Sequence, residues 1–401
     1  MSSKQPPTAR ALFIYLPYVP DRARLDTMPF AKNAVRMLAD SKVSVTVCLW
    51  EHAGCNYREL EANGAVEILY FKNPDLSIRL SRLIARIFKW WFVEPYAFLL
   101  QIIFARFGRY DYICAVGQRG IVVGQAFQRL SGGRLLYFND EFPSGVAFLW
   151  EAKPWARAEK VAVRRAHGIA VPDACRARRL FDELELTPGR IKTYVLPNAP
   201  LLRDGVVPRY WREQLEIDPG KKVVLHAGSV GDWVQIPEIL STIRNWPSDC
   251  ALVIHSRAGD DGIAYEKSLS HLRDEKRIFW SRSKLEEEEL NSLMSTTHCT
   301  LALYRNLGPN LELVGMSSGK IMRSIVLGVP VIATRFPSLS FIEEHGLGVL
   351  VTHPAEIAGA VEAVMARNEE LRQNCLRFRE THADYRKHWA IFWREQQTAA
   401  T

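Results

Sequence analysis

The sequence predicts an α/β protein built from two doubly wound domains, and three observations support this prediction. Short β-branched or apolar runs alternate with helical patterns over most of the 401 residues, which is typical of parallel sheets covered by helices. This length also exceeds what a single hydrophobic core usually organises. Finally, one series of strands and helices ends near Leu196, and a second series begins at Lys222. We therefore expect the domains to meet at the proline-containing segment 196–200.

The first domain is expected over residues 1–197. Its predicted strands are the buried apolar runs at 11–16, 43–49, 112–116, 134–138, 168–171 and 193–196. The segment 28–39 has apolar residues at helical spacing and connects the first two strands. A strand that is followed by a helix and then by another strand predicts parallel pairing.

The second domain is expected over residues 198–373. Its predicted strands lie at 222–228, 251–255, 277–280, 300–304 and 329–334, and its clearest helices lie at 236–244, 284–295 and 354–367. The remaining segment, 374–401, carries aromatic residues at helical spacings (Tyr385, Trp389, Phe392 and Trp393). This spacing predicts a last helix that crosses back to pack on the first domain.

The composition is that of a soluble globular protein, with 48% hydrophobic and 24% charged residues. No segment offers the 18 or so uninterrupted apolar residues that span a bilayer, and the amino terminus lacks the apolar core of a signal peptide. The seven cysteines are scattered without zinc-ligand spacing, which favours reduced thiols in a cytoplasm. The net charge of +8 favours anionic partners.

The segment 80–110 is the most unusual in composition. It interleaves arginines and a lysine with aromatic residues, including the adjacent pair Trp90 and Trp91, and it contains one acid, Glu94. Basic residues beside aromatic ones favour docking on an anionic membrane surface. An amphipathic core helix with solvated arginines is the plainer interpretation, and binding of single-stranded nucleic acid is a weaker one. We expect no nucleic-acid partner, since nothing else in the chain resembles an RNA-binding module.

The segment 317–333 is the most informative about function. Ser317, Ser318, Gly319 and Lys320 form a small-residue turn before a short helix, which a Gly328 stop separates from a buried strand. Free N–H groups at a helix amino terminus attract anions, and a lysine beside them suits a diphosphate. The plainer interpretation is an ordinary α/β connection in which serine caps the helix.

Several segments together resemble the GT-B glycosyltransferases, in particular the group 1 or family 4-like enzymes that build bacterial surface polysaccharides and lipid-linked glycans. Tyr110-Asp111-Tyr112-Ile113 is similar to a strand motif of that family, as is the helix-strand segment 159–171. Leu196-Pro197-Asn198-Ala199 resembles its hinge, and 223–228 its donor-domain glycine loop. The passage 290–301 and the lysine turn at 317–320 complete the series in the family's order.

The resemblance implies two Rossmann-like domains facing a cleft and transfer of a sugar from a nucleotide-diphosphate donor to an acceptor hydroxyl. It implies no metal and no cofactor besides the donor itself. The residues that would bind the donor are Gly228, Ser229, Ser317, Ser318, Gly319 and Lys320.

The chain also departs from the family pattern. A ribose-binding Glu is expected where Arg323 stands, its partner is replaced by Gly315, and a basic pair expected after Gly228 is missing. Arg257 and Arg305 are alternative cations for the donor, and Arg323 is a third. Glu312 is a weak substitute for the missing ribose-binding Glu. Because of these departures, the identity of the donor stays open.

On the acceptor side, Asp140 and Glu141 follow a predicted strand and are candidates for the catalytic base. The resemblance to the xanthan glucuronosyltransferase type supports this role, although a helix cap or turn explains the carboxylates equally simply. Arg24 and Asp26 lie in the loop that would admit the acceptor.

We therefore expect a cytoplasmic glycosyltransferase, peripheral on the inner face of the bacterial plasma membrane, that extends a lipid-linked or cell-surface glycan. A non-hydrolysing sugar-nucleotide epimerase is one alternative. A catalytically degenerate GT-B module that only binds is the other, and the missing Glu pair is its best support.

Overall fold

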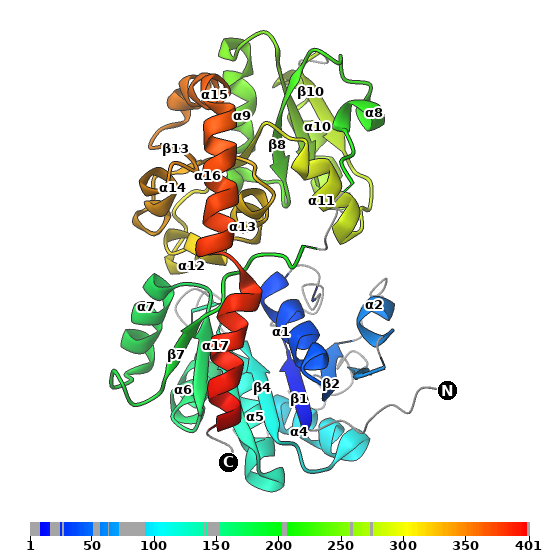
Figure 1. Cartoon of the computed structure of the whole chain (residues 1–401), viewed down its shortest axis with the longest axis vertical. Helices are drawn as coiled ribbons and strands as arrows, with labels where there is room; N and C mark the ends of the chain where they lie inside the picture. The colour runs from blue at the N-terminus through cyan, green and yellow to red at the C-terminus, as the bar shows by residue number, and fades with distance from the viewer. Residues whose placement is uncertain are drawn as a thin grey trace. The chain divides into compact units, whose positions relative to one another are not determined.

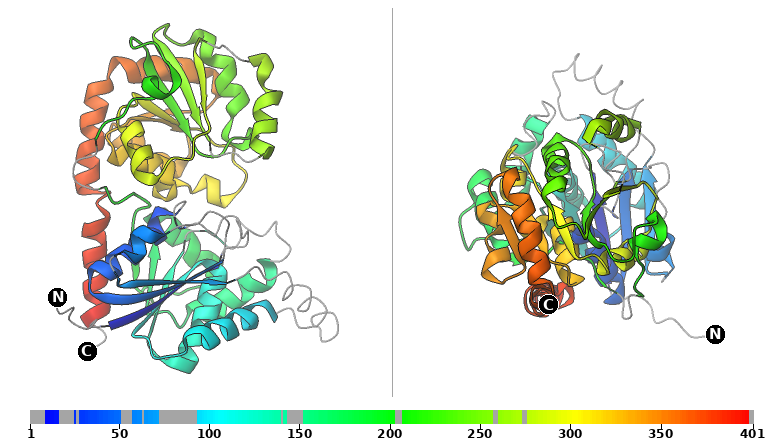
Figure 2. Two further views of the ribbon diagram at one scale, coloured as in Figure 1. Left: turned by 90° about the vertical axis from the view of Figure 1, so that its right-hand side faces the viewer. Right: turned by 90° about the horizontal axis from the view of Figure 1, so that it is seen from above.

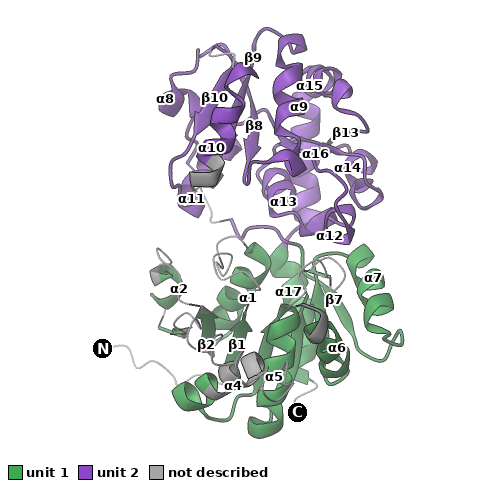
Figure 3. Ribbon diagram, turned by 180° about the vertical axis from the view of Figure 1, so that it is seen from behind, with its two compact units in different colours: residues 1–197, 385–401 green, residues 198–384 purple. Residues whose placement is uncertain are grey.

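The computed structural model describes residues 9–16, 25, 28–50, 57–62, 64–71, 93–139, 141–142, 152–202, 207–256, 260–272 and 276–398. The chain divides into two compact units, coloured separately in Figure 3. Unit 1 comprises residues 1–197 and 385–401, and unit 2 comprises residues 198–384. The boundary at 197/198 is the one the sequence predicted. The return to unit 1 occurs at 385, whereas the sequence placed it at 374.

Unit 1 contains a seven-stranded parallel sheet in the order β3-β2-β1-β4-β5-β6-β7. The strands are β1 (Ala9–Tyr15), β2 (Val43–Trp50), β3 (Val66–Phe71), β4 (Tyr112–Val116), β5 (Arg134–Phe138), β6 (Gly168–Val171) and β7 (Thr193–Val195). The strand order reverses between β1 and β4. In doubly wound sheets such a reversal leaves a crevice at the carboxyl ends of the two strands.

The helices of unit 1 cover both faces of this sheet (Figures 1 and 2). They are α1 (Pro29–Asp40), α2 (Arg58–Glu61), α4 (Val93–Arg106), α5 (Gly117–Ser131), α6 (Ala152–Val163), α7 (Ala174–Leu184) and α17 (Tyr385–Thr398). Of the predicted segment 80–110, residues 80–92 lie outside the described part of the chain. No described helix combines the length and the apolar character needed to cross a bilayer.

The last helix, α17, belongs to unit 1 because its aromatic face is buried there. Tyr385 donates a hydrogen bond to the carbonyl oxygen of Phe30 at 3.0 Å. The ring of Trp393 lies 4.6 Å from that of Tyr112, measured between centroids. The predicted spacing of aromatic residues is therefore the spacing that packs this helix on the first sheet.

Unit 2 contains a six-stranded parallel sheet in the order β10-β9-β8-β11-β12-β13. The strands are β8 (Lys222–Ala227), β9 (Cys250–His255), β10 (Ile278–Ser281), β11 (Cys299–Ala302), β12 (Val331–Thr334) and β13 (Gly348–Val351). The helices are α8 (Trp211–Leu215), α9 (Ile236–Thr242), α10 (Asp260–Ser268), α11 (Glu287–Ser295), α12 (Pro309–Glu312), α13 (Gly319–Val326), α14 (Phe341–Glu344), α15 (Ile357–Ala366) and α16 (Asn368–Thr381). The strand order reverses between β8 and β11.

The alternating side chains of β8 show that both faces of the sheet in unit 2 are covered by apolar residues. Val224 belongs to one buried cluster, whereas Val223 and Leu225 belong to another. Because successive side chains of a strand point to opposite faces, each face has its own apolar core. The predicted strands are present in both units. The sequence did not predict β3 and β13, which lie at edges of the two sheets.

Candidate functional site

The candidate donor site lies at the carboxyl ends of β8 and β11, where the strand order of unit 2 reverses. β8 is followed by Gly228, which has φ of +123°, a value that favours glycine. A Cβ at this position would lie 3.5 Å from Cε of Lys320, so the loop passes directly beside that side chain. β11 leads into Tyr304, whose ring is buried. The two strands thus bring the predicted glycine loop to the predicted lysine.

The amino terminus of α13 is built by the serine turn that the sequence identified. Ser318 is the N-cap, and its hydroxyl oxygen accepts a hydrogen bond from the N–H of Ile321 at 3.2 Å. The same hydroxyl lies 3.1 Å from the hydroxyl oxygen of Tyr304. Ser317 closes the preceding turn through a hydrogen bond from its hydroxyl to the carbonyl oxygen of Val314. Capping and anion binding are compatible, since the first N–H groups of a helix have no partners within the helix.

Lys320 stands in the first turn of α13, half-buried. Its ammonium nitrogen lies 5.7 Å from the centre of the Tyr304 ring, within the range of a cation–π contact. Among the described residues, no hydrogen bond or ion pair engages this ammonium group. Desolvation lowers the pKa of Lys320 to about 7 from an ordinary 10.5. An anion placed beside this amine would restore its charge.

His226 is the second titratable group of the site, at the end of β8. It is fully buried, and its Nε2 lies 3.0 Å from the carbonyl oxygen of Ser229. Burial and the nearby Lys320 lower the pKa of His226 well below its usual value, so the ring is neutral. Because a carbonyl oxygen only accepts, Nε2 carries the proton and Nδ1 is the acceptor. Within the described part of the chain, this buried Nδ1 has no hydrogen-bond partner.

Arg305 holds the loop that follows Gly228. Its Nε donates to the carbonyl oxygen of Asp232 at 2.8 Å, and its guanidinium pairs with Glu238. The ring of Trp233, in the same loop, stacks on Tyr304 with a centroid distance of 6.1 Å. Arg305 was predicted as a donor-binding cation. In this structure its guanidinium is engaged in shaping the loop.

Arg323 is buried between α11 and α13. Its guanidinium donates to Oδ1 of Asn291 and lies 3.5 Å from Oε1 of Glu287. The chain therefore has a carboxylate next to the position where the family resemblance expects one, but that carboxylate comes from α11. Glu312, the substitute named from the sequence, is exposed at the end of α12.

The hinge segment is tied to the serine turn within unit 2. Nδ2 of Asn198 donates to the carbonyl oxygen of Ser317 at 2.7 Å, and its backbone N–H donates to Met316 at 3.1 Å. The Pro-Asn motif and the lysine turn, which are distant in sequence, are therefore parts of one structure.

In unit 1, Glu141 follows β5 and is exposed. Nδ2 of Asn139 donates to the backbone oxygen of Glu141 at 2.9 Å and to the hydroxyl of Tyr137 at 2.8 Å. That hydroxyl in turn donates to Glu159, which is fully buried. This buried network fixes the chain as it leaves the strand, at the carboxyl edge of the sheet.

Four predicted site residues, Arg24, Asp26, Asp140 and Arg257, lie outside the described residues. Their assignments stay predictions. Among the described residues, no group of His, Cys, Asp and Glu side chains is arranged to hold a metal ion.

The sequence did not predict four residues that the structure brings to the candidate site or to Arg323, namely His226, Trp233, Tyr304 and Glu287. His226 and Tyr304 could have been predicted. Each has a polar or amphipathic side chain at the carboxyl end of a predicted apolar strand, where ligands bind in doubly wound sheets. Glu287 could not have been predicted, since only helix packing brings it to Arg323.

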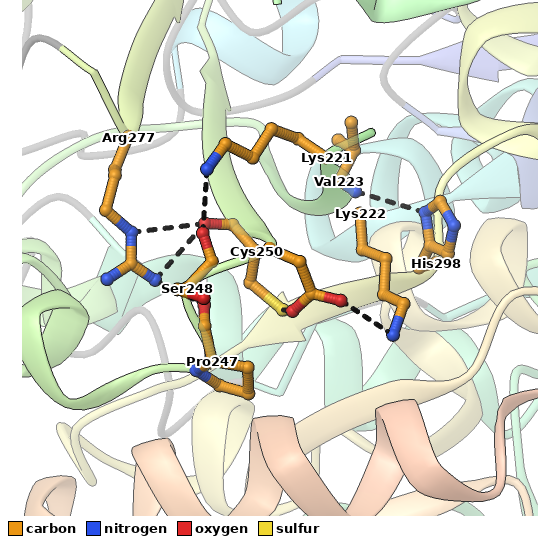
Figure 4. Close-up of polar contacts among 9 residues, drawn as sticks. Lys221, Lys222, Val223, Pro247, Ser248, Cys250, Arg277 and His298 are labelled. Carbon is orange, nitrogen blue, oxygen red and sulfur yellow. Dashed lines mark hydrogen bonds and ion pairs between the residues drawn. The ribbon is translucent and has the colours of Figure 1, made fainter. Parts of the chain in front are cut away.

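The opposite, amino-terminal edge of the same sheet also gathers cations (Figure 4). Lys222 pairs with Asp249 at 2.9 Å, and Lys221 donates to the carbonyl oxygen of Ser248 at 2.7 Å. Arg277 donates to three backbone carbonyl oxygens, those of Trp246, Pro247 and Cys250. Every one of these cations has a partner within the protein.

Comparison with solved structures shows the same architecture over nearly the whole chain. HepE of Anabaena in complex with UDP-glucose matches with a TM-score of 0.68 and 15% identity, covering 97% of this chain and 100% of that one. A sucrose-phosphate synthase from Thermosynechococcus elongatus matches with a TM-score of 0.67 and 13% identity, covering 98% and 100%. An α,α-trehalose-phosphate synthase (UDP-forming) from Burkholderia vietnamiensis matches with a TM-score of 0.66 and 11% identity, covering 98% of each.

No protein-family model matches the sequence, and no curated protein matches it. At these identities the structural similarity establishes the fold.

Proposed function

We propose that this chain, which has the GT-B fold, is a glycosyltransferase that moves a sugar from a nucleotide-diphosphate donor to a hydroxyl of a lipid-linked or cell-surface glycan. The observation that carries the proposal is the position of Lys320. A half-buried amine, a helix amino terminus and a glycine loop converge at the switch point of a doubly wound sheet. The structural neighbour HepE was solved with UDP-glucose and with UDP, which supports a nucleotide-sugar donor.

The proposed chemistry needs charge stabilisation on the leaving group. The acceptor oxygen attacks the anomeric carbon, and the bond from that carbon to the diphosphate oxygen breaks. Negative charge then grows on the diphosphate, where Lys320 and the N–H groups of Gly319 and its neighbours would stabilise it. These residues supply the positive charge that a metal ion supplies in other transferases, so we propose a metal-independent reaction.

The acceptor hydroxyl must also lose a proton. We propose that Glu141 or Asp140 accepts it, because both follow β5 in the sequence and Glu141 is exposed just beyond the carboxyl end of that strand. The network from Asn139 through Tyr137 to Glu159 would hold that segment in place during the transfer.

We further propose that the enzyme works in the bacterial cytoplasm, on the inner face of the plasma membrane, where lipid-linked acceptors are found. The six cysteines that the structure describes are free thiols, five of them buried, in agreement with a reducing compartment.

The test is to incubate the purified chain with a panel of nucleotide-sugars and a lipid acceptor extract. Acceptor-dependent release of nucleoside diphosphate is expected, and it should disappear with Lys320→Ala. Acceptor-free isomerisation of the donor would favour the epimerase. Donor binding without turnover of any donor would favour a module that only binds.

A further inference from the structure

A groove of about 860 Å³ lies at the amino-terminal ends of β4 and β5 in unit 1. One wall is the connection from α4 into β4, with Phe107, Arg109, Tyr110 and Asp111. The other wall is the end of α5 and the turn into β5, from Leu130 to Arg134. The groove is thus at the edge of the sheet opposite the one that carries Glu141.

The rim of this groove exposes large apolar side chains. Phe107 is 61% exposed and Leu130 is 56% exposed, and Phe104, one helical turn before Phe107, is 85% exposed. Phe107 is not loose, because its ring packs edge-on against Phe127 with a centroid distance of 6.4 Å. Single exposed apolar side chains are common, whereas several gathered at one rim are typical of an interaction surface.

Arginines surround the same groove. Arg10 lies over the Tyr110 ring at 4.7 Å and donates to the carbonyl oxygen of Arg109 at 3.3 Å. Arg134 lines the groove, and Arg106, at the end of α4, pairs with Glu67. The rim thus carries two acids, Glu67 and Asp111, and twice as many arginines (Arg10, Arg106, Arg109 and Arg134). Its net charge is therefore positive.

We propose that this groove docks the protein on an anionic phospholipid bilayer, with Phe104, Phe107 and Leu130 entering the interface. Arg109 and Arg10 would contact lipid phosphates. Aromatic and apolar groups flanked by cations suit the headgroup region, where one end of a side chain is dry and the other is wet. The inference rests on the proposed membrane setting and deepens it by naming the surface.

Two further observations favour a bilayer as the occupant. Along the sequence, the segment just before α4 continues the same composition, with Arg82, Arg86, Lys89 and the pair Trp90 and Trp91. In addition, the groove is at the amino-terminal edge of the sheet. Docking there leaves the carboxyl edge, with the candidate base, uncovered.

The test is vesicle flotation of the full chain with phosphatidylglycerol mixed into phosphatidylcholine, compared with phosphatidylcholine alone. Wild type should float only with the anionic vesicles. Phe104→Ser with Phe107→Ser should lower the partition coefficient by about tenfold, from lost apolar insertion. Arg109→Gln should lower it by about fivefold, and this difference should shrink in high salt.

Matched controls come from α6 in the same unit. Val161 is 62% exposed, so Val161→Ser removes an apolar side chain as exposed as Phe107. Arg157→Gln removes one charge from an exposed site. Neither control should change flotation. Circular dichroism and nucleoside diphosphate affinity should be unchanged in all the variants, which shows that they are folded.

Three outcomes would overturn the inference. The first is flotation of the Phe104 and Phe107 double variant at the wild-type level. Release by Trp90→Ser with Trp91→Ser alone would place docking on the preceding segment. A dimer of wild type that the double variant abolishes, seen by light scattering without lipid, would make this face a self-association surface. Turnover with a detergent-solubilised acceptor tests the proposed function separately, since it needs no vesicle.

Discussion

Both edges of the sheet in unit 2 carry lysines, and the surroundings shift the pKa values of these lysines in opposite directions. At the amino-terminal edge, the hydrogen bond to Asp249 raises the pKa of Lys222 above its ordinary value. At the carboxyl edge, desolvation lowers the pKa of Lys320 to about 7. At the first edge, drawn in Figure 4, carboxylate and carbonyl groups of the protein pair with the cations. The second presents an amine that gains from an added anion.

This difference separates cations that complete the hydrogen bonding of the fold from a cation that has no hydrogen-bond or ion-pair partner among the described residues. Arg277 and Lys221 donate to backbone carbonyl oxygens in the turn before β9, which adds to the hydrogen bonding of the fold. Lys320 has the Tyr304 ring beside it and a buried neutral His226 nearby, and neither group neutralises a charge. Perturbed pKa values at the switch point of a doubly wound sheet mark a candidate binding site.

The largest expected effect follows from removing the carboxyl-edge lysine. Lys320→Ala should weaken nucleoside diphosphate binding by about a hundredfold, because a charge-assisted phosphate contact is worth roughly 1.5–3 kcal/mol. Isothermal titration calorimetry measures this affinity. Lys222→Ala is the matched control and should leave it unchanged, since that lysine lies at the other edge. Equal losses from the two variants would remove the contrast between the edges.

Removing a cation from the amino-terminal edge should instead affect stability. Arg277→Met keeps the apolar stem but leaves the carbonyl oxygens of Trp246, Pro247 and Cys250 without this donor. We expect a loss of about 2 kcal/mol in the free energy of unfolding of unit 2. Chemical denaturation measures it. Diphosphate affinity should be retained under native conditions, and its loss in a folded variant would contradict the structural role.

The smallest expected effect is a pH dependence of binding. A diphosphate favours the charged amine, so the pKa of Lys320 should be higher in the complex than in the free protein. Between those two pKa values binding takes up a proton, and affinity should fall by up to about tenfold for each unit of pH rise above 7. Calorimetry in buffers of different ionisation enthalpy counts the proton.

Lys320→Arg is the control for this pH effect, because a guanidinium stays charged over the whole range. Its binding should keep only the part of the pH dependence that belongs to the phosphate groups. The same slope in wild type and Lys320→Arg would show that Lys320 does not titrate.

Much of the fold was predictable because parallel strands buried on both faces are continuous apolar runs. The strands around 112–116, 134–138 and 222–227 were found in this way, and Gly328 correctly marked the end of α13. β13 was missed because the short run at Gly348 lies at the sheet edge, where the apolar signal is weaker. The boundary near Pro197 was predictable from its prolines.

The candidate site was predictable only in part. The turn from Ser317 to Lys320 is local, so its residues and its cap could be read directly from the sequence. The partners of that turn could not, since Tyr304, His226 and Asn198 reach it through the sheet and the hinge. The role of Arg305 depends on a loop conformation that the sequence does not specify.

Most of the strands and helices, the boundary at 197/198 and the lysine turn follow from the sequence, because these depend on periodicity and on local capping chemistry. The tertiary structure alone decided that Lys320 is desolvated, that Arg323 is paired with Glu287, and that Phe104 and Phe107 are exposed. Charge state and exposure depend on what surrounds a side chain, and residues distant in sequence supply those surroundings.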